Sequence, residues 1–501
     1  METVQAASRP DVTEQRTLQR GSIGLPSAIV QGAAMVAPTA GIVATVAFIA
    51  SYAGLASPLT FAVGTVICLA IALVVGEYAR RVVTAGSFYS FLRATFGASA
   101  GFVAGIILAL SYFIVFGFQL GFFGSFIQGL GANGGYAVAW QIVAVALVTI
   151  NVGLTIVGIR PSLRLGLIAL GFECAVLLVL AIIIVAQGGA TGNTLQAFNP
   201  SHSLGGSHGF WIAVVYTIFA FTGFESAATL GEEVKRPRRT IPLAVIGTVI
   251  AIGAFETFMS YASVIGYGTS KHDVASLVAA PSPIASLATR YSGSALHTLV
   301  TLAIVSSFTA LNLVTISALA RMTYSMARDR LLPRSLGVLN RWNAPGRAAV
   351  AIGVSSLVYA LAVGSHWGPQ NLAAWMSYFA TLFWILAYAC VVVGVVRFIW
   401  TKYRAEWSWL RHGVVPLVAL GGLAWVAYGN VVPLPPSPLR DFIWATIGVT
   451  AAVAAFGYWL KRRRPDIVER AAYVFDDQIG DEDISSVPQD TSAALGHSTV
   501  S

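Results

Sequence analysis

Charged side chains are scarce in this chain of 501 residues, in which aspartate, glutamate, lysine and arginine together make up 10%. A water-soluble domain carries about a quarter of such residues. Hydrophobic residues account for 56% of the chain, and its mean hydropathy is +0.75. A soluble fold of this composition would have too little polar surface to face water. The composition therefore argues against an ordinary soluble protein and favours lipid as the solvent for most of the chain.

Cysteine and histidine are also few, and neither occurs in the spacing of a metal site or a catalytic pair. The three cysteines, Cys68, Cys174 and Cys390, lie in different apolar runs, which argues against a disulfide framework or a metal site. The seven histidines fall in predicted loops, at a span edge or in the tail, so no span holds a nucleophile and base pair. There is no Walker A motif and no pore signature. We expect no cofactor, and a membrane-embedded enzyme or a channel is a disfavoured alternative.

Long apolar runs are abundant, and they recur along the whole chain. A helix needs about 20 such residues to cross the hydrocarbon core of a bilayer. The runs are continuous rather than alternating, which favours helices over a barrel. The fold class predicted is an all-α integral membrane protein with about twelve transmembrane helices, at 25–50, 58–76, 99–128, 137–157, 163–187, 211–231, 241–267, 296–320, 348–364, 372–396, 414–432 and 442–460.

Basic residues are unevenly divided between the two sides that these spans define. The net charge of +9 and the pI near 9.6 could suggest nucleic acid as a partner. Of the 30 lysines and arginines, however, 27 fall on one side, and only Lys271, Arg290 and Arg440 fall on the other. The positive-inside rule then predicts a protein of the cell membrane with both termini in the cytoplasm and no nucleic-acid partner.

The two ends of the chain are polar. We expect residues 1–20 and 461–501 to be disordered cytoplasmic tails. No cleavable signal peptide is expected, because the first apolar run starts after about 24 polar residues and is too long for a signal-peptide core.

Two spans carry interruptions near their middle. Span 1 contains Pro38 between Gly32 and Gly41, and span 6 contains Gly223 followed by Glu225. Proline removes a backbone donor and disrupts a helix. Broken helices at matching positions of two halves are typical of inverted-repeat transporters, and spans 1 and 6 lie five apart. We therefore expect both spans to be unwound, with residues 34–41 not forming a regular helix; a simple proline kink is the alternative.

Three sequence patches carry a resemblance to a known family. They are FTGFES at 221–226 with GEEVKRPRRTIP at 231–242, AGSFYSF at 85–91, and ARDRLLP at 327–333. In order and spacing they resemble the amino acid–polyamine–organocation (APC) transporter superfamily, of the amino acid permease type. The resemblance implies a transporter domain at 21–460 with a LeuT-like 5+5 inverted-repeat core. The repeats would cover about 25–187 and 211–396, and two extra helices would cover about 414–460.

The resemblance also implies secondary active transport by alternating access, proton-coupled or by exchange. The substrate would be an amino acid or related amine, bound between the unwound parts of spans 1 and 6. The substrate-binding residues expected on this basis are Ala37, Pro38, Thr39, Phe219, Thr222 and Gly223. Asn312, one helical turn from Thr315 in span 8, is a further candidate.

One departure from the family leaves the substrate open. The usual Gly-x-Gly of span 1 is replaced by Ala37-Pro38-Thr39, and Pro38 cannot donate a hydrogen bond. This feature is reminiscent of putrescine importers, so a polyamine importer of the same fold is the alternative.

Three glutamates lie within the predicted spans, where ionisable residues are costly and usually functional, and a fourth directly follows one. Glu225, after the break in span 6, and Glu173, near the place of a family lysine in span 5, are expected to serve in proton coupling or gating. Glu256 in span 7 is expected to face an external vestibule. Glu77, at the end of span 2, is expected to pair with a loop arginine. We therefore expect three partners, which are the lipid bilayer, the small-molecule substrate and a coupled proton.

Overall fold

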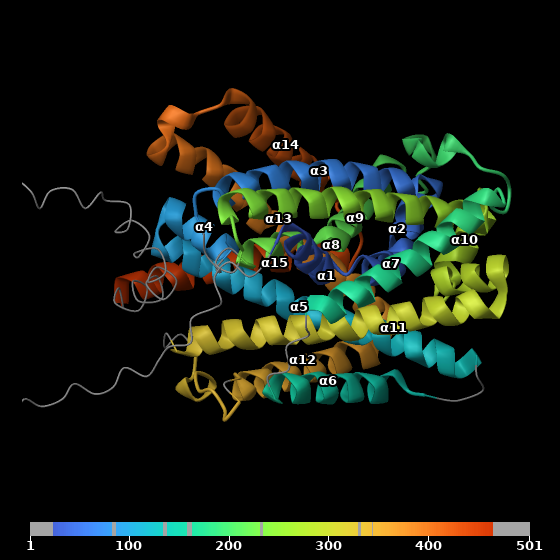
Figure 1. Ribbon diagram of the computed structural model, residues 1–501, viewed down its shortest axis with the longest axis horizontal. Helices are drawn as coiled ribbons and strands as arrows, with labels where there is room; N and C mark the ends of the chain where they lie inside the picture. The colour runs from blue at the N-terminus through green and yellow to red at the C-terminus, as the bar shows by residue number, and fades with distance from the viewer. Residues whose placement is uncertain are drawn as a thin grey trace, which may run out of the picture.

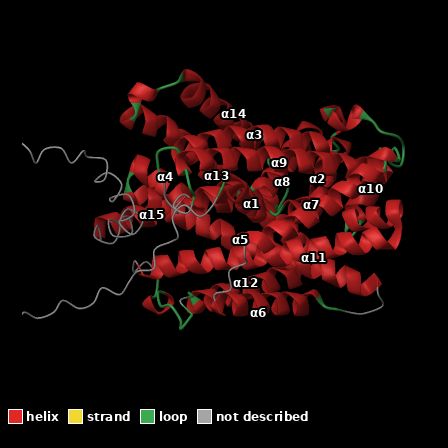
Figure 2. Cartoon of the chain, viewed as in Figure 1, coloured by secondary structure: helices red, strands yellow, loops and turns green. Residues whose placement is uncertain are grey.

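The computed structural model describes residues 24–82, 87–133, 138–157, 163–230, 234–328, 332–342 and 344–463. Over these ranges the chain is helical, with short turns and no β-strand (Figure 2). The predicted N-terminal tail lies outside the described residues, as does the C-terminal tail from residue 464 onward. The last helix continues to Arg463, so it includes the first three residues assigned to the C-terminal tail. Parts of the three family patches, at 85–86, 231–233 and 329–331, also lie outside.

Eleven helical stretches of the described chain are long and apolar enough to cross a membrane. The first, Ala28–Ala79, has 52 residues and would be about 78 Å long as one helix, far more than the roughly 30 Å of a bilayer core. It turns at Gly54–Ala56, which divides it into two crossings and reconciles the count with the twelve predicted spans. The prediction of an all-helical, multi-pass membrane fold is therefore confirmed.

The bounds of the spans are close to those predicted, except that the eighth begins at Pro283 rather than near residue 296 and is interrupted by the non-helical Gly293, with φ 74° and ψ −164°. Span 1 consists of α1 (Leu25–Val36) and α2 (Pro38–Ala53), and span 6 consists of α8 (Gly206–Phe221) and the 3₁₀ segment η4 (Phe224–Leu230). The remaining spans are α3 (Ser57–Ala79), α5 (Ala98–Asn133), α6 (Trp140–Val157), α7 (Leu163–Ala186), α9 (Pro237–Tyr267), α11 (Pro283–Arg328), α12 (Gly346–Trp367), α13 (Pro369–Lys402), α14 (Val415–Val431) and α15 (Leu439–Arg463).

Two shorter helices lie at opposite ends of the bundle, α4 (Ser87–Phe96) at one and α10 (Lys271–Ala279) at the other (Figure 1). The first turn of α10 is held by a capping box, in which the Ser270 hydroxyl and the Asp273 backbone N–H are 3.2 Å apart. Hydrogen bonds from the Ser270 side chain and backbone hold the pKa of the Asp273 carboxyl below its usual range.

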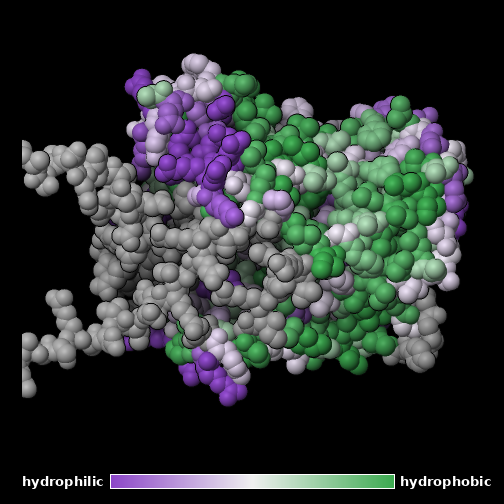
Figure 3. Space-filling view, viewed as in Figure 1, coloured by the Kyte–Doolittle hydropathy of each residue, from purple (hydrophilic) through white to green (hydrophobic). Residues whose placement is uncertain are grey.

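The outer surface of the bundle is apolar between its two ends. Large hydrophobic side chains on the outer helices are exposed, among them Ile142, Ile168, Val354, Leu417 and Trp425. Figure 3 shows a broad hydrophobic face, with hydrophilic residues gathered toward the ends of the long axis. An exposed apolar surface of this extent is unfavourable in water and is expected of a face that contacts lipid.

The two broken spans lie in the interior of the bundle. Every residue of α8 from Phe210 to Phe221 is buried except Trp211, and α2 is buried over most of its length. The two pack against each other, α2 also against α9 and α11, and α8 also against α3 and α13 (Figure 1). A helix that is apolar on all sides is expected to be enclosed by other helices. The interruptions of spans 1 and 6 are therefore covered by protein rather than by lipid, which is where irregular backbone is tolerated in a membrane.

Candidate functional site

The break in span 1 is confined to one residue. α1 ends at Val36, Ala37 adopts a left-handed conformation with φ 50° and ψ 68°, and α2 begins at Pro38. Ala37 is the sole non-glycine residue with positive φ in the described part of the chain. The expected irregular stretch at 34–41 is therefore too wide, because residues on both sides keep helical hydrogen bonds. Proline suits the first position of α2, where its missing N–H is not needed.

The break in span 6 is longer. α8 ends at Phe221, Thr222 turns the chain with ψ 134°, and Gly223 has φ 107°, a conformation that favours glycine. A Cβ added at Gly223 would lie 3.0 Å from Met35 Cγ and 3.1 Å from the Met35 carbonyl oxygen. The backbone of the second break is thus packed directly against the end of α1. The two interruptions, nearly 190 residues apart in the sequence, meet in the interior of the bundle.

A cavity of about 40 Å³ lies beside these breaks. Its walls come from spans 1, 3, 6, 8 and 10. They are formed by Met35, Val36, Ala40, Gly41, Tyr112, Val115, Phe118, Gln119, Phe219, Ala220, Thr222, Leu311, Thr315 and Trp384. The cavity is mainly apolar and aromatic, with one polar pair in which Gln119 Nε2 donates to Thr315 Oγ1 over 3.0 Å. Ligand pockets usually measure about 300–1,000 Å³, so a substrate would need side chains or helices to move apart.

The residues expected to bind substrate are all in this region, but only two of them line the cavity. Phe219 forms a wall with its ring packed edge-on against Phe118 at 4.8 Å, and Thr222 lies next to the break. Ala37, Pro38 and Thr39 are buried at the break in span 1 without forming part of the wall.

Two further candidates also lie outside the cavity wall. Gly223 faces Met35, and the buried Asn312 donates from Nδ2 to the Phe308 carbonyl oxygen over 2.8 Å. Tyr112, Gln119 and Trp384 do line the cavity, although sequence reasoning did not single them out. They lie in uniformly apolar helices, where no periodic pattern marks the inward face.

Glu225 connects the break in span 6 to span 10. Its Oε2 accepts hydrogen bonds from the Gly223 backbone N–H at 3.1 Å and from the Tyr388 hydroxyl at 3.3 Å. Its Oε1 has no hydrogen-bond partner, and the side chain is only 3% exposed. Trp384, which lines the cavity, has its indole near the same carboxyl. The indole N–H does not form a hydrogen bond. The carboxyl is therefore one side chain away from the cavity.

The other buried acids lie elsewhere. Glu173 faces Ser306 and Ser307 of α11 and is not part of the cavity wall. Glu256 does not face an external vestibule, as the sequence had suggested, because its side chain is fully buried against α2. In the described ranges no group of three or more histidine, cysteine, aspartate or glutamate side chains could hold a metal ion.

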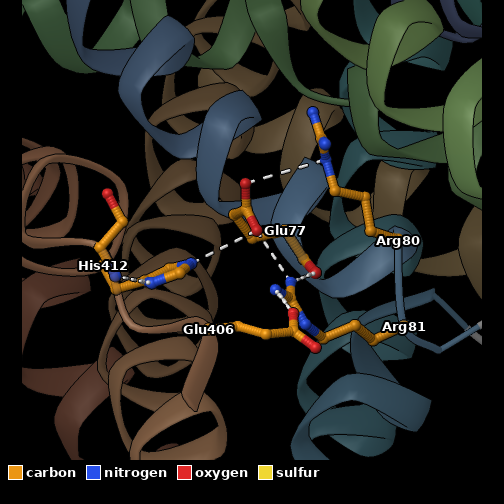
Figure 4. Close-up of polar contacts among 6 residues, drawn as sticks. Glu77, Arg80, Arg81, Glu406 and His412 are labelled. Atoms are coloured by element: carbon orange, nitrogen blue, oxygen red, sulfur yellow. Dashed lines mark hydrogen bonds and ion pairs between the residues drawn. The ribbon is translucent and has the colours of Figure 1, made fainter. Parts of the chain in front are cut away.

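Glu77 forms an ion cluster at the α4 end of the bundle (Figure 4). As predicted, it pairs with loop arginines: Arg81 Nη1 lies 2.8 Å from Oε2, and Arg80 Nε lies 3.8 Å from Oε1. Arg81 also reaches Glu406 at 2.6 Å, and His412 Nε2 lies 3.4 Å from Glu77 Oε2.

The His412 ring is oriented by the backbone of Ser408. Its Nδ1 accepts the Ser408 N–H at 2.9 Å, so its proton lies on Nε2 and points at Glu77. The cluster therefore fastens the end of α3 to the segment between α13 and α14.

Comparison with known proteins finds one family model and several named transporters that are similar to this chain. A family model described as amino acid permease matches residues 23–456. The chain is 24% identical over 437 residues to the branched-chain amino acid permease BcaP of Lactococcus lactis subsp. cremoris (strain MG1363), which covers 83% of this chain and 90% of that protein. It is 27% identical to BcaP of Bacillus subtilis (strain 168), with 57% and 62% covered. It is 22% identical to the methylthioribose transporter of the same Bacillus strain, with 84% and 89% covered.

Proposed function

This chain belongs to the amino acid permease family of the APC superfamily, and on that premise we propose that it is a secondary active transporter of amino acids that works by alternating access. The observation that carries the proposal is the meeting of two broken helices beside a mainly apolar cavity. Such breaks expose backbone groups to a substrate at the middle of the membrane. Movement of α1 relative to η4 would open the cavity to one side or the other.

The lining favours an amino acid with an apolar side chain. Phe118, Phe219 and Trp384 offer aromatic surface for an aliphatic chain, and Gln119 and Thr222 offer polar groups for the ammonium and carboxylate. The names of two relatives, both branched-chain amino acid permeases, agree with this choice. Leucine, isoleucine and valine are therefore the substrates we propose.

A polyamine importer is the less favoured alternative. A molecule with two ammonium groups needs carboxylates at both ends, because an unpaired charge is costly in a dry site. The described wall of the cavity contains no aspartate or glutamate. Glu225 is near, but Oε2 already accepts two hydrogen bonds.

The energy source we propose is a proton gradient or exchange of one amino acid for another. Glu225 and Glu173 are buried acids in spans that border the moving parts, and such acids are often proton carriers in transporters. We also propose that the protein lies in the cell membrane with both termini in the cytoplasm, because 27 of its 30 basic residues fall on that side.

The test is counterflow of radiolabelled leucine into liposomes that contain the purified full chain and are preloaded with unlabelled leucine. We expect saturable uptake that isoleucine and valine inhibit and that putrescine and methylthioribose do not. Ala40→Phe, which fills the cavity, should abolish counterflow, whereas Ala47→Phe, on the same helix outside the cavity, should retain it. Inhibition by putrescine alone would favour the polyamine alternative, and leucine uptake by Ala40→Phe at the normal rate would contradict the site.

A further inference from the structure

Glu256 of α9 is a buried acid with no polar partner. The residue is 0% exposed, and neither Oε1 nor Oε2 has a hydrogen-bond partner. A Cβ added at Gly41 would lie 2.8 Å from Oε1, so α2 approaches the carboxyl as closely as glycine permits. Gly41 and Ala220 both line the cavity, which places this carboxyl directly behind the cavity wall.

The surroundings of Glu256 differ from those of the other buried acids. Glu225 accepts two hydrogen bonds, and Glu173 faces two serine hydroxyls. In the part of the chain that the structure describes, no lysine, arginine or histidine forms an ion pair with Glu256. A charged carboxylate in a dry site without a donor or a cation is strongly unfavourable. In this arrangement the carboxyl must therefore be neutral or hold a cation.

The neighbouring helix ends do not support a negative charge either. The Ala220 carbonyl oxygen would lie 3.6 Å from the same added Cβ of Gly41, so it lies on the same side as the carboxyl. It belongs to the last turn of α8, where carbonyl groups lack helical partners and carry partial negative charge. The start of α2 carries N–H groups without helical partners at Thr39 and Ala40, but neither Glu256 oxygen accepts a hydrogen bond from them. A protonated carboxyl could instead donate to such a carbonyl.

The titratable side chains near Glu256 include two thiols. Cys68 of α3 and Cys174 of α7 are both within its electrostatic reach. Cys68 also lies near Glu225, and Cys174 follows Glu173 in the sequence. The described part of α1 contains no titratable residue, and α2 contains only Tyr52, near its far end.

The close approach of α2 distinguishes a proton from a metal cation. A sodium ion needs several oxygen ligands and room for its own volume. The contact between Gly41 and Oε1 leaves no such room on that side, whereas a proton needs none. Ser260, one helical turn along α9, is buried with an unpartnered hydroxyl and adds a single polar neighbour.

We propose that the Glu256 carboxyl is a proton-binding site of the transport cycle, occupied while spans 1, 6 and 7 are packed as described and released when α2 moves away from α9. Movement of α2 would admit water, which stabilises the ionised form. The two conformations then differ in proton affinity, as any coupled site requires. The role in transport rests on the proposed function, but the protonation itself does not.

Infrared difference spectroscopy tests the protonation without a substrate. We expect the spectrum of the purified full chain minus that of Glu256→Gln to contain the C=O stretch of a protonated carboxyl at neutral pH. The matched control is Ser263→Ala, a buried position on the same helix whose hydroxyl bonds only to the Met259 carbonyl oxygen, and it should keep the band. A carboxylate band in place of the protonated one, or a band that changes with sodium, would overturn the proposal. So would failure of Glu256→Gln to fold, because glutamine is the neutral isostere.

Transport tests the coupling. In liposomes, the ratio of leucine uptake driven by a pH gradient to leucine counterflow should fall by about tenfold in Glu256→Gln and stay constant in Ser263→Ala. An unchanged ratio in Glu256→Gln would overturn the coupling role. Absence of leucine counterflow in the unmodified chain would instead refute the proposed substrate and leave the infrared result to decide the proton site.

Discussion

Single acids within the membrane differ mainly in the donors that surround them. Glu225 has two, the Gly223 backbone N–H and the Tyr388 hydroxyl, and both contact the same oxygen. These bonds join an irregular piece of span 6 to the regular helix α13. A carboxylate accepts such bonds more strongly than a neutral group does. Glu225 is therefore suited to hold the break in one geometry and to release it when its charge or its partners change.

Glu225→Gln is expected to keep the fold but to lock or uncouple transport, because the amide keeps one acceptor and loses the charge. Glu225→Asp should be milder, since it keeps the carboxylate on a shorter arm. Tyr388→Phe removes one donor alone and should cost about 1 kcal/mol of stability. The measurement is leucine counterflow together with proton-driven uptake in the same liposomes. Normal values of both for Glu225→Gln would reduce the residue to a structural acid.

At the scale of the element, the break in span 1 depends on one strained residue. Ala37 has φ 50° and is only 4% exposed, so its conformation is imposed by the helices on either side. A residue with a Cβ pays roughly 1–2 kcal/mol for the left-handed region, and glycine does not. The chain therefore keeps this bend at a cost, and the cost can be changed by a single methyl group.

Ala37→Gly is expected to stabilise the protein by up to about 1 kcal/mol, reduced by the extra freedom of glycine in the unfolded chain. Ala37→Val should destabilise it, because a β-branched side chain is worse in the left-handed region and has no space in a buried site. Thermal unfolding in detergent measures both. Ala50, buried at a regular position of α2, supplies the control: there glycine should lower stability. A stabilising effect at both positions would contradict the strain at Ala37.

The ion cluster around Glu77 joins the end of α3 to the segment between α13 and α14 at the α4 end of the bundle. Glu77→Gln removes the charge that Arg81 and His412 both face, so we expect a loss of about 1–3 kcal/mol in stability and a lower unfolding temperature. Arg440→Gln is the matched control. Arg440 is paired with Asp441 over a comparable distance but is half exposed, so its replacement should leave the unfolding temperature unchanged. Equal shifts for the two variants would show that burial does not strengthen the cluster.

The helices could be predicted from the sequence far better than the cavity. The spans can be recognised by the length and apolarity of their sequence runs. Pro38 and Gly223 marked the positions of both breaks. The facing residues of spans 3, 8 and 10 could not be found in this way, because those helices are apolar on all sides and show no preferred face. The position of Glu256 depends on how closely α2 packs at Gly41, a tertiary fact that no local pattern carries.

For the whole molecule, the distribution of polar and basic residues is the basis of the proposed orientation. The apolar face in Figure 3 separates hydrophilic ends, with α10 at one end and α4 at the other in Figure 1. Basic residues are concentrated on the predicted side of α4, which would retain that side in the cytoplasm during insertion.

Cysteine labelling in intact cells tests the orientation. In a background whose three cysteines are replaced by serine, a membrane-impermeant maleimide should label Lys271→Cys from outside and miss Lys235→Cys. Permeabilised cells should label both positions, which controls for accessibility. Labelling of Lys235→Cys in intact cells would overturn the topology.

The single-residue break at Ala37 also has a mechanical consequence. α1 has 12 residues and is therefore about 18 Å long, a stiff rod that packs against α9 and η4 and is joined to α2 through the single residue Ala37. A torsional change of about 20° at that joint would swing the far end of the rod by roughly 6 Å relative to α2. That amplitude is comparable to the width of an amino acid. A change in two backbone torsions next to the cavity would therefore be enough to open or close a path at the surface of the bundle.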